Sequence, residues 1–191
     1  MASTGIRGNG ERRTALLVID MINPLDFEGA AQLHPHAVVA AKRIATLARR
    51  LRGRGWPVVY VNDNFLHWQA DFREIVTLVR HGSRGAELAE LLAPVPGDYF
   101  VLKPKHSGFL ATPLEILLEK LGADAVVVTG VATDGCVLAT AMDAHMREYG
   151  VHVPRDCVAA ITSARSKRAI ELMADGMGID VRTARYVSPC S

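Results

Sequence analysis

Short apolar runs rich in β-branched residues alternate with longer segments of helical periodicity along almost the whole chain. Such runs are typical of strands buried on both faces, as in a parallel sheet. The expected strands are residues 14–20, 57–62, 99–103, 124–130, 151–154 and 178–183. The expected helices are residues 35–53, 70–80, 84–92, 112–121, 135–149 and 163–175. Because right-handed crossovers place helices on both faces of a parallel sheet, the alternation predicts a Rossmann-like, three-layer αβα sandwich around a mostly parallel six-stranded sheet.

The domain organisation is expected to be simple. Residues 1–13 are polar and glycine-rich, which predicts a disordered N-terminal lead-in. Residues 14–191 contain no repeat and no linker-like tract, which predicts a single domain. The first residues lack the apolar stretch of a signal peptide, and no apolar run approaches the roughly 20 residues of a membrane-spanning helix. We therefore expect a cytoplasmic protein.

Charge and cysteine content exclude several classes of function. The formal net charge is +2 and like charges form only short clusters, so we expect neither nucleic acid nor membrane as a partner. The three cysteines, Cys136, Cys157 and Cys190, are an odd number and match no zinc-binding spacing. Each is therefore expected to be a free thiol, and Cys157 and Cys190 are assigned structural or incidental roles.

Three reactive side chains stand at or just after predicted strand ends. The first strand ends in Asp20, the third ends in Lys103, and the fourth leads through a turn to Cys136. Taken singly, each has an ordinary explanation as a solvated carboxylate, a surface amine or a small core residue. Ligands of open parallel sheets bind beyond the carboxyl ends of the strands, so the three side chains are candidates to meet around one pocket. Together they form a set suited to acyl transfer, with a thiol nucleophile, a carboxylate that carries its proton, and an ammonium.

The turn VVTGVATDGCV (127–137) adds a second element of this chemistry. Successive backbone N–H groups that enter a helix form a site for an oxyanion, and Gly135 lets a ligand approach the backbone beside the thiol. Thr133 and Asp134 are good N-cap residues for the helix that follows. The helix start and the Lys103 ammonium are both expected to favour the thiolate form of Cys136.

At these residues the chain resembles the isochorismatase-like cysteine hydrolases, a superfamily that includes nicotinamidases, N-carbamoylsarcosine amidases and ureidoacrylate-type amidohydrolases. The resemblance runs from about residue 14 to residue 187. The motifs that carry it are LLVIDMINPLDF (16–27), VVYVNDNF (58–65), VLKPKHSGF (101–109), VVVTGVATDGCVLATAMDAHMREYGVHVPRDCVAA (126–160) and ARSKRAIELM (164–173).

The resemblance implies specific roles for the reactive residues. Cys136 would be the nucleophile, Asp20 the general base and acid, and Lys103 the residue that holds both charges in place. A cis peptide is implied between Val131 and Ala132, with the backbone N–H groups of Ala132 and Cys136 as the oxyanion hole. The expected reaction is hydrolysis of a small amide or carbamoyl compound through a thioester, by a homodimer or homotetramer.

Segments next to these residues supply candidates for the substrate pocket, and motif position favours this role over packing for Phe27 and Phe109. These candidates are Asn23, Phe27, Phe65, Trp68 and Phe109.

Two departures from relatives of this superfamily narrow the expected activity. Nicotinamidases carry an Asp-x-His pair that binds a metal, but here Asp63 is followed two residues later by Phe65. His67 is four residues on, and His81 and His106 do not restore the spacing, so no metal and no other cofactor is expected. Members that act on isochorismate lack the nucleophilic cysteine, which disfavours that activity here.

Two alternatives to a cysteine hydrolase remain at the level of sequence. A nucleotide-binding Rossmann protein would require a G-x-G-x-x-G fingerprint or a P-loop, and the segment after the first strand has neither. A redox sensor or binding module that uses only the Cys136 thiol fits the motifs as well as an enzyme does. Ammonia release from amides and ureides would separate the enzyme from the sensor.

Overall fold

The structure of the protein is a computed structural model that describes residues 13–63 and 71–188. The described residues therefore exclude all of the predicted lead-in except its last residue. They also exclude Phe65, His67, Trp68 and Cys190. Among the helices that are described, none is long and apolar enough to cross a membrane.

The centre of the molecule is a parallel six-stranded sheet, as predicted. Its strands are β1 (Thr14–Ile19), β2 (Val58–Asp63), β3 (Tyr99–Lys103), β4 (Ala125–Val131), β5 (Gly150–His152) and β6 (Val158–Ala159). The strand order is β3-β2-β1-β4-β5. Strand β5 pairs with the first part of β4, and β6 pairs with its last two residues, Gly130 and Val131. The inner strands β1 and β4 are buried along their whole length, which explains their continuous apolar sequence.

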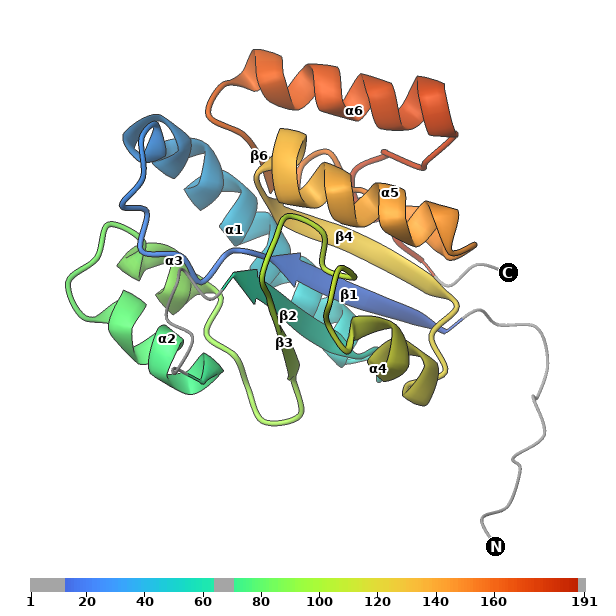
Figure 1. Cartoon of the computed structure of the whole chain (residues 1–191), viewed down its shortest axis with the longest axis horizontal. Coiled ribbons are helices and arrows are strands. Elements are labelled where there is room, and N and C mark those ends of the chain that lie inside the picture. Colours follow the sequence, from blue (N-terminus) through green and yellow to red (C-terminus); the bar gives the residue numbers. More distant parts are fainter. Residues whose placement is uncertain (1–12, 64–70, 189–191) are drawn as a thin grey trace, which may run out of the picture.

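Helices cover both faces of this sheet (Figure 1). They are α1 (Ala30–Arg52), α2 (Phe72–Arg80), α3 (Ala86–Leu91), α4 (Leu114–Lys120), α5 (Leu138–Met146) and α6 (Ser163–Met177), with a π-helical turn η1 (Thr133–Val137) and a 3-10 turn η2 (Ala184–Tyr186). Alternate residues of β1 enter two separate cores. Leu16 and Val18 pack with α1, α2 and α3, whereas Leu17 and Ile19 pack with α4, α5 and α6. This arrangement is the predicted three-layer sandwich.

The predicted strand at residues 178–183 was wrong. In that segment only Asp180 joins the sheet, through a single bridge to His152 of the three-residue edge strand β5. The Asp180 carboxylate accepts hydrogen bonds from the backbone and side chain of Arg182, so the chain turns away from the edge. The sixth strand is instead β6, which has two residues and is too short to produce a periodic sequence pattern.

The first helix begins earlier than predicted. The predicted helix spans residues 35–53, but α1 begins at Ala30 and contains Pro35. Proline near the start of a helix removes few backbone hydrogen bonds, so the surrounding core decides where the helix begins. Ala30 and Leu33 are buried in that core.

The strand register brings the predicted reactive residues to one edge. Ile19, just before Asp20, pairs with Val61 and with Gly130, and Asp63 pairs with Lys103. The carboxyl ends of β1, β2, β3 and β4 therefore lie side by side.

Candidate active site

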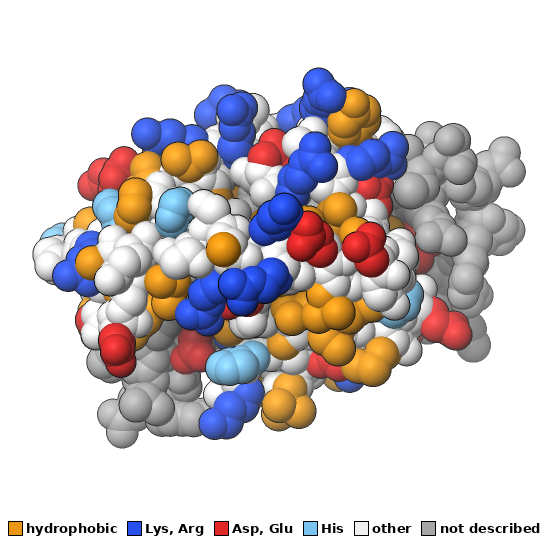
Figure 2. Space-filling view, turned by 90° about the horizontal axis from the view of Figure 1, so that it is seen from above, with side chains coloured by type: hydrophobic (Ala, Val, Ile, Leu, Met, Phe, Trp, Pro, Cys, Tyr) orange, Lys and Arg blue, Asp and Glu red, His pale blue; other side chains and the backbone are white. Residues whose placement is uncertain are grey.

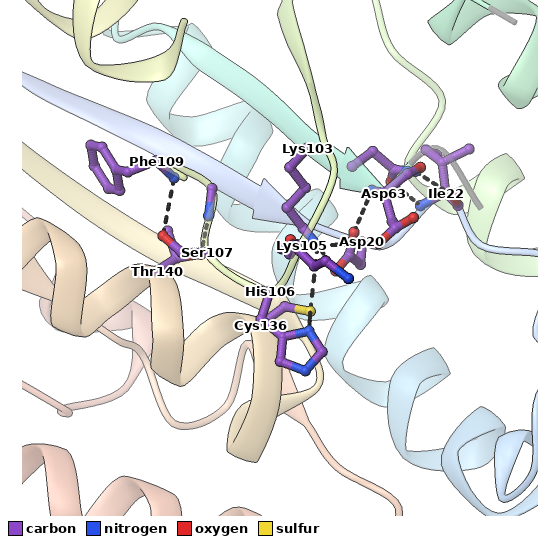
Figure 3. Close-up of polar contacts among 12 residues, drawn as sticks. Asp20, Ile22, Asp63, Lys103, Lys105, His106, Ser107, Phe109, Cys136 and Thr140 are labelled. Carbon is purple, nitrogen blue, oxygen red and sulfur yellow. Dashed lines mark hydrogen bonds and ion pairs between the residues drawn. The ribbon is translucent and has the colours of Figure 1, made fainter. Parts of the chain in front are cut away.

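Asp20, Lys103 and Cys136 meet at this edge of the sheet (Figure 3). The Lys103 Nζ lies 2.9 Å from Asp20 Oδ2 and 3.4 Å from Cys136 Sγ. Lys103 is 1% exposed and Asp20 is 5% exposed, so their ion pair is almost completely buried. Charged residues are seldom buried to this extent without a partner, and here each is the partner of the other.

Asp20 is held by the neighbouring strand β2. Its backbone N–H donates to the Val61 carbonyl at 3.0 Å, and its Oδ1 accepts a 2.7 Å hydrogen bond from the Asp63 backbone N–H. Its φ of 51° lies in the left-handed region, which aspartate tolerates better than most residues. The carboxylate is thus aimed at Lys103 by the backbone conformation that ends β1.

The buried Lys103 ammonium lies close to three oxygen atoms and one sulfur atom. Besides Asp20 and Cys136, Nζ donates to the Lys105 carbonyl at 3.0 Å and lies 3.8 Å from Asp63 Oδ2. These contacts direct its charge toward the site from the interior of the protein.

Cys136 stands in the π-helical turn between β4 and α5. The Ala132 carbonyl accepts hydrogen bonds from Gly135 N–H at 3.0 Å and from Val137 N–H at 3.1 Å, which closes the turn around the thiol. The peptide between Val131 and Ala132 is cis. Within the described residues, the hydrogen bonds outside helices and strands include none from the Ala132 N–H.

Helix α6 holds the turn from its outer side. The Thr133 and Ser166 hydroxyls are 2.9 Å apart, and the Arg165 guanidinium forms an ion pair with Asp134. Thr133 is completely buried, so the residues just before the thiol are fixed against α6.

The segment after Lys103 is fixed against helix α5. Ser107 Oγ contacts the Asp143 carboxylate, and the Thr140 hydroxyl accepts a 3.0 Å hydrogen bond from the Gly108 N–H. Because α5 begins just after Cys136, the ammonium and the thiol belong to one connected unit.

Burial controls the protonation of this cluster. Burial raises the pKa of Asp20 above its usual value of 3.8, although Lys103 opposes this effect. Burial would lower the pKa of Lys103, but attraction to Asp20 and Cys136 raises it overall. Burial and the charge of Asp20 raise the pKa of Cys136 to about 12, in spite of Lys103.

The Lys103 ammonium was expected to favour the thiolate form of Cys136. Lys103 does lower the pKa of the thiol, but burial and the nearby carboxylate outweigh it. The net effect is a raised pKa of Cys136, which favours the thiol over the thiolate.

The three described pocket candidates form no hydrogen bond, ion pair or ring contact with these three residues, and their role in a pocket stays a prediction. Asn23 is buried, and its side chain accepts a hydrogen bond from the Leu25 N–H. Phe109 packs against Tyr149 beneath the Arg147 guanidinium, away from Cys136 in Figure 3. Phe27 is 43% exposed in the loop after β1.

Sequence reasoning missed three residues that contact or support the cluster. The Asp63 backbone N–H donates a hydrogen bond that orients Asp20. The buried Asn62 side chain forms hydrogen bonds with both the N–H and the carbonyl of Ile22, two residues after Asp20. His106 Nδ1 lies 4.0 Å from Cys136 Sγ. Its place three residues after Lys103 was the available signal, but His106 was considered only as a metal ligand.

No group of three His, Cys, Asp or Glu side chains that could hold a metal ion occurs in the described part of the chain. His67 lies outside that part. The other described cysteine, Cys157, is fully buried in the core beneath α1.

The chain is similar to proteins of one family over most of its length. The isochorismatase domain matches residues 14–185. The isochorismatase family protein YaaI of Bacillus subtilis is 35% identical over 173 residues, which cover 91% of this chain and 95% of that protein. Maleamate amidohydrolase of Pseudomonas putida is 32% identical over 155 residues, which cover 77% of this chain and 72% of the enzyme.

A solved structure shows the same similarity in three dimensions. The N-carbamoylsarcosine amidase from Thermoplasma acidophilum matches with a TM-score of 0.70 and 32% sequence identity. The match covers 92% of this chain and 99% of that one.

Proposed function

The chain belongs to the isochorismatase family of hydrolases, and from this premise we propose that it is a cysteine-dependent amidohydrolase that works through a thioester. The observation that carries the proposal is the buried Lys103 ammonium, which reaches the Asp20 carboxylate and the Cys136 sulfur from one position. Nucleophile, proton carrier and positive charge then act on the same reacting atoms.

In the first half of the reaction, Cys136 Sγ attacks the substrate carbonyl carbon and its proton passes to Asp20. The carbonyl oxygen becomes an oxyanion, which the backbone N–H groups of Ala132 and Cys136 stabilise. When the tetrahedral species collapses, the C–N bond breaks and Asp20 returns the proton to the leaving nitrogen. Ammonia or an amine departs, and the acyl group remains on sulfur.

In the second half, a water molecule attacks the thioester carbon and gives a proton to Asp20. The C–S bond then breaks, the acid product leaves, and Cys136 recovers its proton. Lys103 stays charged throughout because its pKa is raised. It keeps Asp20 ionised at the start of each half-reaction and offsets charge on sulfur.

The substrate class follows from the relatives and from the chemistry. One relative is a maleamate amidohydrolase and another is an N-carbamoylsarcosine amidase, so both act on C–N bonds of small molecules. We propose a small amide or carbamoyl compound as the substrate of this chain.

Replacement of the nucleophile tests the proposal. Cys136→Ala is expected to abolish ammonia release from a panel of small amides and ureides, because no other group can form the thioester. Circular dichroism and the melting temperature should stay close to those of the wild type. Cys157→Ala is the matched control, since this thiol lies in the core and its variant should keep most of the activity. Turnover by Cys136→Ala at the wild-type rate would refute the mechanism.

A further inference from the structure

His106 lies on the solvent side of the proposed nucleophile. Its Nδ1 is 4.0 Å from Cys136 Sγ, and its side chain is exposed. The Lys103 ammonium approaches the same sulfur from the interior, where the lysine side chain has no exposed surface. In Figure 3 the imidazole ring lies next to the sulfur, on the side away from Lys103.

The backbone on both sides of His106 is fixed by contacts within the site. Before it, the Lys105 carbonyl accepts a 3.0 Å hydrogen bond from Lys103 Nζ. After it, the buried Ser107 contacts Asp143 of α5, and Gly108 donates to Thr140 of the same helix. The helix and the lysine that position the sulfur thus also position the His106 backbone.

The distance leaves the imidazole within reach of both the thiol and a substrate bound beside it. A carbonyl carbon about to be attacked lies about 3–3.5 Å from the nucleophile, and hydrogen bonds span about 2.7–3.2 Å. A ring nitrogen 4.0 Å from Sγ is therefore close enough to contact a group attached to that carbon. The sulfur therefore has the Lys103 ammonium on one side and the His106 imidazole on the other.

We propose that His106 is a specificity-determining residue that hydrogen-bonds an oxygen-bearing group, in the strongest case a carboxylate, next to the attacked carbon. One cation beside the site is not paired with a described carboxylate. Asp20 and Asp63 face Lys103, and Asp134 is paired with Arg165. The adjacent Lys105 is exposed and forms no ion pair with any described residue. This inference rests on the proposed role of Cys136 as nucleophile.

Alkylation of Cys136 tests the inference without knowledge of the substrate. Iodoacetate and iodoacetamide both form an S–C bond with loss of iodide, but only iodoacetate carries a carboxylate on the carbon that joins sulfur. The rate for each reagent is measured in the wild type, His106→Asn and His106→Phe, with peptide mass spectrometry to assign the label to Cys136. His145→Asn is the matched control, because that histidine is exposed on α5.

His106→Phe is expected to lower the iodoacetate rate relative to the iodoacetamide rate by about tenfold, the loss expected for one hydrogen bond to a charged group. His106→Asn should retain most of the ratio, because its amide nitrogen occupies a position similar to Nδ1. If His106→Phe changes both alkylation rates by the same factor, or changes neither, His106 does not contact the incoming carboxylate. That result would overturn this inference and leave the proposed function untouched. The nucleophile itself is tested by the loss of amide hydrolysis in Cys136→Ala, so failure of that proposal can be distinguished from failure of this inference.

Discussion

The side chains of the site are arranged around one buried positive charge. Lys103 contacts Asp20, Cys136 and the Lys105 carbonyl, although burial opposes its ionisation. A buried ion pair contributes little net stability, because desolvation of both charges offsets most of their attraction. The pair is therefore better explained by the chemistry that it supports than by the stability of the fold.

The protonation of Asp20 predicts the pH dependence of activity. The proposed base works only when ionised, and burial raises its pKa above 3.8. Activity should therefore fall as pH decreases through a value above the ordinary carboxyl range. No loss is expected on the alkaline side below the ordinary lysine pKa of 10.5, because the pKa of Lys103 is raised and that of Cys136 is about 12. The measurement is kcat/KM against pH.

Asp20→Asn is the control for this profile. It should remove the acid limb and reduce kcat/KM by roughly 10²–10⁴-fold, the range typical of a lost general base. An activity that instead increases with pH through the ordinary thiol pKa of 9.0 would show that a free thiolate, rather than Asp20, limits the reaction.

At the scale of the elements, strands β1 and β4 approach each other at Gly130 more closely than a residue with a side chain would allow. Gly130 has φ 112°, and a Cβ built on it would lie 2.1 Å from the Ile19 carbonyl oxygen. That carbonyl immediately precedes Asp20, and Gly130 is followed by the turn that carries Cys136. The close approach at Gly130 therefore comes directly before both the proposed base and the turn that carries the proposed nucleophile.

Gly130→Ala is expected to destabilise the fold by more than about 2 kcal/mol, from steric overlap and from a backbone conformation that alanine avoids. Chemical denaturation measures this loss. Gly176→Ala is the matched control: this glycine lies in α6, and its added Cβ would make only an ordinary 3.5 Å contact with Leu172. The control should gain up to about 1 kcal/mol from helix propensity. Equal effects at both sites would refute the steric argument.

The contacts of α5 and α6 show how these two helices support the site. Helix α6 holds the turn before Cys136 through Ser166 and Arg165, while α5 holds the segment after Lys103 through Thr140 and Asp143. None of these four side chains was expected from sequence to serve the site. They act by fixing the backbone that presents the reactive groups.

At the scale of the whole molecule, one face combines hydrophobic and charged groups. Figure 2 shows hydrophobic side chains among lysines, arginines and acidic residues on the side that α6 covers. The exposed hydrophobic side chains of α5 and α6 include Met142, Met146 and Leu172. Met142 and Met146 are four residues apart and lie on the same side of α5.

The expected homodimer or homotetramer remains a prediction, and this methionine pair allows a test. We expect sedimentation analysis of the wild type to give a multiple of 20.7 kDa. Met146→Glu should shift the mass toward the monomer, because association would bury a charge. Leu78→Glu is the control, since Leu78 is 48% exposed on the distant helix α2. A monomeric wild type would disprove the oligomer, and an unchanged Met146→Glu would exclude this face.

The sequence by itself determined the layer architecture and the identity of the central residues. Its alternating pattern reflects burial, and a strand buried on both faces must be apolar at nearly every position, as β1 and β4 are. The same pattern located Asp20, Lys103 and Cys136, because the ends of parallel strands necessarily lie at one edge. These features depend on local composition and on general rules of chain connection.

Only the tertiary structure decided the features that depend on neighbours distant in sequence. Strand β6 has two residues and forms because they pair with β4. Residues 178–183 do not form the predicted strand, because only one of them bridges to β5. The pKa of Cys136 is raised because burial and Asp20 together outweigh Lys103. His106 reaches the sulfur because Lys103 and α5 fold its segment back over the site. Each outcome is a balance of long-range contacts, which no local pattern of residues records.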